Sequence, residues 1–308
     1  MKKVLILGCS HSAGSYDHND PNKADNSNGW PALISNNFPN WQVHCVTHFG
    51  GGILNYMWTL GYLIDKFGKD YFDKIIIEIT DEPRLAMYNN QFNDLSQFKY
   101  TSDIKDQYYE IEKSFSSMTR EEYVKNKPPQ INTKGSYINY IVSQSYQFHD
   151  KEELITVDEN DLNDENLLEG KYRSFVSLNV YLILMAENFL TVIKSLYDDS
   201  KLFGFIWEFY PMLISYALPF RFKNKKDKKH FHEKYYPIID DFRTLTEEKW
   251  KKSFPFIAES SAVNYIKETK GIKQELLYRM PDNSSHYDKE GNLLVYKYLE
   301  PHLESFLI

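Results

Sequence analysis

The chain has 308 residues, with 43 acidic and 36 basic side chains and a formal net charge of −7. This balance argues against a nucleic-acid binder that works by neutralising phosphates. Two cysteines are too few for a disulfide scaffold, and they form no CxxC pair that would suggest a zinc or redox site. The length permits one large domain or two ordinary ones.

The amino-terminal segment MKKVLILGCS has a charged start but few apolar residues before a polar stretch. It therefore predicts no signal peptide and a cytoplasmic protein. The most apolar window, 176–193, is interrupted by Asn179, Glu187 and Asn188 and predicts no membrane helix. We expect neither membrane insertion nor a nucleic-acid partner, and no sequence feature specifies the oligomeric state.

Strands and helices are predicted to alternate over the first 80 residues. Short apolar runs predict buried strands over 3–8, 41–47 and 74–80. Apolar residues at helical spacing predict helices over 30–36 and 53–67. This order predicts a parallel sheet covered by helices, with a ligand site at the carboxyl ends of the strands.

The apolar pattern weakens from about residue 87 to 172, which predicts a large insertion with a helix near 110–125 and further local structure. Core-like sequence returns in a helix over 174–197 and a strand over 201–209. After a polar segment at about 220–252, the pattern predicts a short strand over 254–258 and helices over 260–269 and 292–306. We predict a single domain over 1–308.

Two short patterns carry candidate chemistry. GCSHSAG, at 8–14, follows the first strand, and DNSSH, at 282–286, precedes the last helix. A serine hydroxyl becomes a nucleophile when a histidine removes its proton, and a carboxylate fixes the tautomer of that histidine. Ser10, His286 and Asp282 are therefore the candidate catalytic residues.

These patterns resemble the SGNH (GDSL-type) hydrolases. The resemblance rests on GCSHSAG, the glycines at 50–52, the strand end ITDEP and the terminal Asp…His pair. The subgroup with a GCSxxxG first block is also similar in its early Trp-Pro, here Trp30-Pro31. The resemblance covers about residues 1–90 and 175–308.

The resemblance implies a flavodoxin-like three-layer α/β/α sandwich with a central parallel sheet. It assigns Ser10 as the nucleophile and its N–H as an oxyanion donor, Gly51 as a second donor, His286 as the base and Asp282 as the acid. It also implies a serine esterase that forms an acyl-enzyme and needs no metal or organic cofactor.

The chain departs from this family in two places. Thr80 stands where the family has an asparagine oxyanion donor, and Asn55 is a substitute by position. The spacing from Asp282 to His286 is one residue longer than usual, so Asn283 occupies the usual place of the acid. Asn55, Asn283 and His11 are therefore candidate auxiliary or substrate-contacting residues.

Several other residues are given structural interpretations. Cys9 and Cys45 are expected to be buried, reduced thiols. His230-Phe231-His232 lies in a basic run and is expected to be solvated rather than metal-binding. Three tryptophans are expected to pack in the core: Trp30, Trp58 and Trp207.

The predicted function is hydrolysis of O-acyl esters on a small molecule or glycan. A carbohydrate is favoured because polar segments and 24 tyrosines suit a hydroxyl-rich ligand. Two alternatives stay open on the same frame. One is a non-catalytic binding or structural protein, and the other is an O-acyltransferase that uses the same triad.

Overall fold

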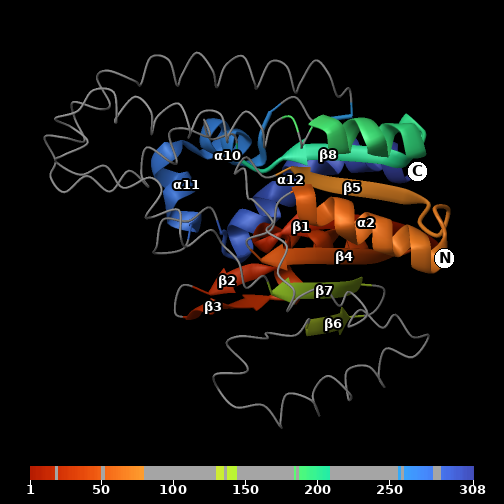
Figure 1. The fold of residues 1–308 in the computed structure, drawn as a ribbon. Helices are drawn as coiled ribbons and strands as arrows, with labels where there is room; N and C mark the ends of the chain where they lie inside the picture. The colour runs from red at the N-terminus through yellow and green to blue at the C-terminus, as the bar shows by residue number, and fades with distance from the viewer. Residues whose placement is uncertain are drawn as a thin grey trace, which may run out of the picture.

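The computed structural model describes residues 1–17, 20–49, 53–79, 130–134, 137–143, 184, 187–208, 256–257, 260–279 and 286–308. These residues build one six-stranded sheet with helices on both faces, and a separate two-stranded hairpin (Figure 1). The α/β class predicted from the alternation of apolar periods is therefore confirmed.

The central strand of the sheet is β1 (Lys2–Cys9). It pairs in parallel with β4 (Trp41–Phe49) on one side and β5 (Lys74–Ile79) on the other. β8 (Leu202–Ile206) pairs in parallel with β5. These are the four strands that the apolar runs predict. Of the short strand expected at 254–258, the described residues show one bridge, between Ile257 and Gly204.

Two further strands come from the segment predicted as an insertion. β7 (Tyr137–Ser143) pairs in parallel with β4, and β6 (Gln130–Lys134) pairs antiparallel with β7. The sequence pattern predicted no strands here, because the polar β6 and the interrupted apolar pattern of β7 lack the continuous apolar runs of the buried strands. The sheet order is β6-β7-β4-β1-β5-β8. The helix expected at 110–125 and the polar segment at 220–252 lie outside the described residues.

Alternate residues of β1 serve two separate cores. Leu5 and Leu7 face α2 (Ile53–Phe67) and the helical residues 187–196. Val4 and Ile6 face α1 (Trp30–Asn37), α10 (Ala262–Lys270) and α12 (Lys289–Leu307). Because successive strand residues point to opposite faces, one apolar strand fills both layers.

The predicted core role of tryptophan is confirmed at two of three positions. Trp30 and Trp207 are both fully buried in the core that contains α12. The side chain of Trp58 lies outside the described part of α2.

Three further elements were not predicted. The polar segment after the GCSHSAG pattern contains β3 (Asp20–Asp25), which pairs antiparallel with β2 (Ser15–Asp17). A short helix, α11 (Ile272–Tyr278), follows α10 after Gly271, whose φ is +89°. Polar strands of this length lack the apolar alternation on which strand prediction depends.

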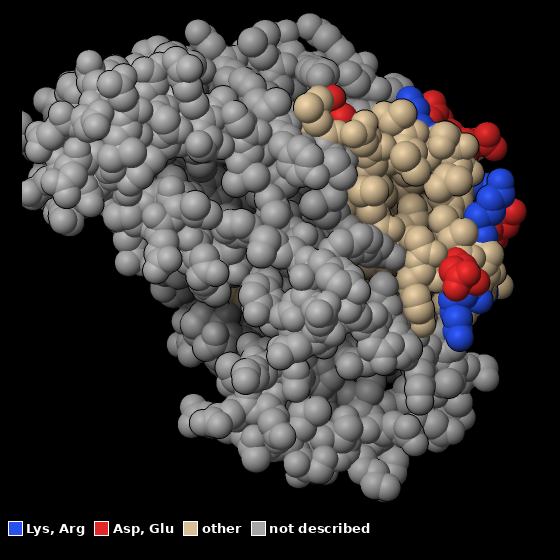
Figure 2. Space-filling view, viewed as in Figure 1, with Lys and Arg blue, Asp and Glu red and all other residues tan. Residues whose placement is uncertain are grey.

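Charged side chains gather at the end of the sheet opposite the carboxyl ends of its strands. In the view of Figure 2, the middle of the described surface carries uncharged side chains. Most of the charged ones lie toward the edge where Figure 1 shows both termini. Lys201 and Asp70 pair there at 3.1 Å, and Lys194 and Asp199 at 3.8 Å. Exposed pairs of this kind contribute little to stability. No helix among the described residues has the length and apolar character needed to cross a membrane.

His44 makes stability depend on pH. It lies in β4, buried against the rings of Phe72 and Tyr71. Burial, with a smaller effect of the Lys3 charge, lowers the pKa of His44 from 6.5 to about 4. The unfolded chain therefore binds a proton at His44 in a pH range where the folded protein does not. The contribution of the neutral, buried His44 to the free energy of unfolding is complete above about pH 6.5 and is lost as the pH falls toward 4.

We expect His44→Phe to lose this pH dependence. Between pH 7 and pH 4.5, His44 should lower the free energy of unfolding of the natural protein by about 2–3 kcal/mol. Urea unfolding at the two pH values measures the difference. An equally large loss in His44→Phe would contradict the assignment.

Candidate functional site

The candidate site begins where β1 ends. A 3₁₀ turn, Ser10–Ser12, follows Cys9, and the Ala13 N–H closes it by donating to the Ser10 carbonyl at 3.1 Å. Gly14 continues the chain with φ of +146°, a conformation that residues with a Cβ rarely adopt. The turn lies at the carboxyl end of the central strand, where ligands bind in parallel sheets.

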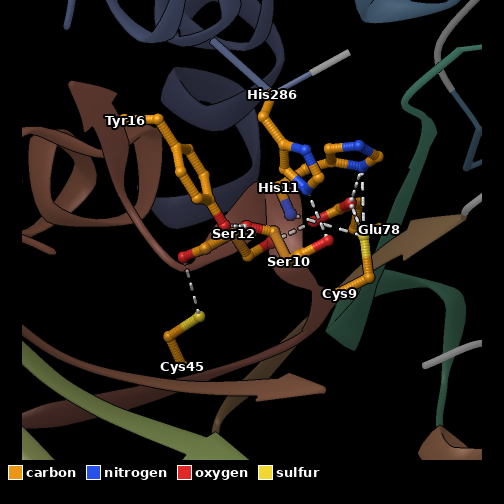
Figure 3. Close-up of polar contacts among 8 residues, drawn as sticks. All are labelled: Cys9, Ser10, His11, Ser12, Tyr16, Cys45, Glu78 and His286. Carbon is orange, nitrogen blue, oxygen red and sulfur yellow. Dashed lines mark hydrogen bonds and ion pairs between the residues drawn. The ribbon is translucent and has the colours of Figure 1, made fainter. Parts of the chain in front are cut away.

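Ser10 and His286 are far apart in the chain but in contact in the fold. The Ser10 Oγ lies 2.7 Å from the His286 Nε2, although 276 positions separate the two residues (Figure 3). Ser10 is 4% exposed, whereas His286 is partly exposed. A serine at this distance from an imidazole nitrogen can transfer its proton to that nitrogen.

Glu78 contacts the turn from its buried side. It is fully buried in β5, and its Oε1 accepts the Cys9 thiol at 2.9 Å and lies 3.3 Å from the His11 Nδ1. Its Oε2 accepts a hydrogen bond from the Ser12 hydroxyl. These three partners are the neighbours that surround Ser10 in the turn. A carboxylate removed from water is retained only with such donors, so Glu78 and the turn fix one another.

Aromatic rings surround the histidines. The ring of His11 stacks on Trp207 at 4.5 Å with an interplanar angle of 4°. The ring of His286 lies 4.7 Å from that of His11 and 4.7 Å from that of Tyr16. The Tyr16 hydroxyl donates to the Ser10 carbonyl at 2.8 Å. His286 is therefore positioned by packing on two sides, and Tyr16 also contacts the Ser10 backbone.

Asn292 joins the two ends of the chain. It is 1% exposed in α12, and its Nδ2 donates to the carbonyls of Tyr287 at 2.9 Å and Gly14 at 3.4 Å. Its Oδ1 accepts the Trp30 N–H at 3.2 Å. The backbone N–H of Tyr16 also donates to the Tyr287 carbonyl at 3.0 Å. The segment that carries His286 is thus tied to the segment that follows Ser10.

A buried ionic cluster closes the loop that contains His286. Arg279 and Tyr287 form an antiparallel bridge. The Arg279 guanidinium donates to Glu275 at 2.5 Å and to Glu208 at 2.8 Å, and the Tyr287 hydroxyl donates to Glu275 at 2.5 Å. Burial, followed by the charge of Glu275, raises the pKa of Tyr287 well above its usual range. Tyr287 therefore stays a hydrogen-bond donor, and the base of the loop is held by charge-assisted bonds.

Both cysteines are buried and neither forms a disulfide, as predicted. Burial raises the pKa of Cys45 to about 12, so its thiol stays protonated at neutral pH. The Cys45 thiol lies 3.8 Å from the Ser12 carbonyl that it approaches as a donor. Cys9 instead lies in the polar cluster around Glu78.

One group of side chains in the described residues has the composition of a metal site. Cys9, His11 and Glu78 each offer a ligand atom, and these atoms lie within 4.8 Å of one another. The sequence predicts no metal site, because neither cysteine belongs to a CxxC pair and Glu78 is distant from both in the chain.

The predicted site residues divide into two groups. Ser10 and His286 are brought together, and His11 lies beside both. The structure does not describe four of the predicted residues: Asp282, Gly51, Thr80 and Asn283. Of Asn55 it describes the backbone but not the side chain.

Sequence reasoning missed Glu78, Tyr16 and Asn292. A signal was present for Glu78, since KIIIEI places one acidic residue in a run that predicts a buried strand. A buried acid needs polar partners, which predicts a site at that strand end. Tyr16 and Asn292 give no such signal, because their partners are backbone groups brought near by the fold.

The arrangement has the parts of a nucleophilic site. A hydroxyl and an imidazole are in contact, the turn beneath them is fixed by a buried carboxylate, and the imidazole is partly exposed.

No family model, curated protein or solved structure matches the chain.

Gly8→Ala should destabilise the protein. A Cβ at this position lies 2.6 Å from the Ser12 Cβ and 3.0 Å from the Glu78 Oε2, so the turn must move. We expect a loss of about 1–3 kcal/mol in the free energy of unfolding, measured in urea. Gly61→Ala is the matched control, because nothing lies within 4 Å of a Cβ there. It should be neutral or stabilising by up to about 1 kcal/mol, since Gly61 lies in α2. Equal effects of the two changes would contradict the packing at Gly8.

Asn292→Asp should also be destabilising, because it places a carboxylate against the carbonyls of Gly14, Tyr287 and Asp288. We expect a loss of about 2–3 kcal/mol at pH 7. Asn37→Asp, at an exposed position of α1, should change the free energy of unfolding by less than about 1 kcal/mol. A loss at Asn292 no larger than at Asn37 would show that the amide does not join the two segments.

Proposed function

We propose that the chain is a serine esterase of the SGNH (GDSL-type) class that hydrolyses O-acyl esters, with an acylated carbohydrate as its substrate. The observation that carries this proposal is the 2.7 Å contact between the Ser10 Oγ and the His286 Nε2. It joins the two residues that the sequence patterns single out independently, from opposite ends of the chain.

The proposed reaction has two steps. His286 takes the Ser10 proton at Nε2 while the Ser10 Oγ attacks the acyl carbonyl carbon. As the tetrahedral intermediate collapses, His286 gives this proton to the leaving alcohol, and the acyl group stays on Ser10. Water then attacks the acyl-enzyme with His286 again as base, which releases the acid and restores the hydroxyl.

The oxyanion donors and the acid come from the family resemblance. Gly51 follows β4 by two residues and Thr80 follows β5 directly, and both strands are hydrogen-bonded to β1. Their carboxyl ends lie at the same edge of the sheet as the Ser10 turn. In this proposal the N–H groups of Ser10 and Gly51, with Thr80, stabilise the oxyanion, and Asp282 orients His286.

The strand order supports a flavodoxin-like frame. Numbered in chain order with β7 left aside, the strands β4-β1-β5-β8 run 2-1-3-4, as in the flavodoxin-like sheet, and β7 adds a further parallel strand beyond β4. In that topology the ligand site lies at the switch point, where the chain passes from one side of the first strand to the other. Here that point is between β1 and β5, which carry Ser10 at a strand end and Glu78.

A carbohydrate ester is the proposed substrate class because a tyrosine offers both an aromatic ring and a hydroxyl, which suit contact with a sugar. The chain has 24 tyrosines, several of them in the polar segment between about 87 and 172.

Ser10→Ala tests the proposal. We expect the natural protein to release p-nitrophenol from a short acyl ester and acetate from acetylated glycans. Ser10→Ala should lower kcat/KM by roughly 10³-fold or more, because the acyl-enzyme cannot form. A fluorophosphonate should add one label to the natural protein and none at this position in the variant, as read by peptide mass. Ser305→Ala, on the exposed side of α12, is the matched control and should keep both properties.

The alternatives give different results. No hydrolysis of either substrate type and no fluorophosphonate labelling would overturn the esterase proposal and favour a binding or structural role. Acyl products on an added sugar in place of free acid would instead indicate an O-acyltransferase with the same triad.

A further inference from the structure

Three buried donors of different chemistry converge beneath Ser10. The Cys9 Sγ lies 3.0 Å from the His11 Nδ1 and 2.9 Å from the Glu78 Oε1, and the latter two atoms are 3.3 Å apart. Cys9 and Glu78 are fully buried, and His11 is 5% exposed. Figure 3 shows the three side chains directed toward one point, on the side of the turn that faces Glu78.

The spacing of these donors is close to that of a tetrahedral metal site. Ordinary Zn–S, Zn–N and Zn–O bonds place such donors roughly 3.3–3.6 Å apart. An ion therefore fits when the sulfur moves about 0.5 Å away from the other two atoms. Three ligands from two neighbouring strand ends leave the fourth tetrahedral position for a water molecule.

The donor types select the class of ion. A thiolate with an imidazole and one carboxylate suits Zn²⁺ and similar transition-metal ions, whereas Mg²⁺ and Ca²⁺ prefer oxygen ligands alone. A divalent cation here also lies against a fully buried carboxylate, which favours its retention.

The ligands are held in place by their surroundings. The His11 ring is stacked on Trp207, which fixes its plane, and the second oxygen of Glu78 is bonded to the Ser12 hydroxyl. Such outer contacts orient metal ligands and raise affinity.

From this geometry we propose that Cys9, His11 and Glu78 bind one transition-metal ion of the Zn²⁺ class. Two of the ligands are the chain neighbours of Ser10, so the ion fixes the turn that carries the nucleophile from both sides. Binding is measured without any substrate, so this proposal stands or fails separately from ester hydrolysis.

Co²⁺ gives a direct test, because a thiolate ligand produces a charge-transfer absorption that imidazole and carboxylate ligands lack. The 308-residue protein is reduced, freed of metal with a chelator and titrated with Co²⁺. We expect this near-ultraviolet band and the visible bands of tetrahedral Co²⁺ to saturate at one ion per chain. Zn²⁺ should abolish both sets of bands and raise Tm.

Variants assign the ligands. Cys9→Ala should lose the charge-transfer band, and both Cys9→Ala and His11→Gln should bind Zn²⁺ more than about tenfold more weakly. Cys45→Ala is the matched control, because this second buried cysteine belongs to no such group among the residues that the structure describes. The double change His230→Gln with His232→Gln is a second control, which removes the two histidines of the basic run. Both controls should keep the band and the affinity.

Two results would overturn the proposal. One is the absence of a charge-transfer band in the natural protein, shown to be folded by circular dichroism, with Co²⁺ in excess. The other is a band and a Zn²⁺ affinity that Cys9→Ala leaves unchanged. If Cys9→Ala does not fold, an unchanged Zn²⁺ affinity in His11→Gln overturns it instead.

Discussion

A carboxylate fully removed from water is the constraint on which the candidate site depends. Glu78 sits in a strand whose neighbours in the chain are isoleucines, yet it is surrounded by a thiol, a hydroxyl and an imidazole. These groups come from the last residue of β1 and from the turn that follows it, so satisfying one buried acid fixes the shape of that turn. Gly8 belongs to the same constraint, because a side chain there would occupy the space between Ser12 and Glu78.

The second requirement is that the two ends of the chain meet. Ser10 follows β1, whereas His286 lies shortly before the last helix, and no strand pairing within the described residues connects them. The connection is made by the Asn292 amide and the ring of Tyr16, with the Arg279 cluster at the base of the loop. Polar groups that are buried and satisfied specify one arrangement, because any displacement leaves several of them unpaired.

The same turn therefore serves two chemistries on its two sides. The Ser10 hydroxyl faces the partly exposed His286, as a nucleophile must, and the side chains before and after it face the buried Glu78. A 3₁₀ turn makes this division, because successive side chains leave it about 120° apart. The proposed esterase site and the proposed metal site are thus neighbours that share a backbone.

The sequence by itself determined the α/β class, four parallel strands, the helices next to them and the two residues of the Ser10–His286 contact. Buried parallel strands and amphipathic helices have strong apolar periods, and a serine after the first strand falls at the edge where ligands bind. Only the tertiary structure decided the partners of Glu78, the role of Asn292 and the place of β6 and β7 in the sheet. Those features depend on contacts between segments far apart in the chain, and local periodicity contains no information about such contacts.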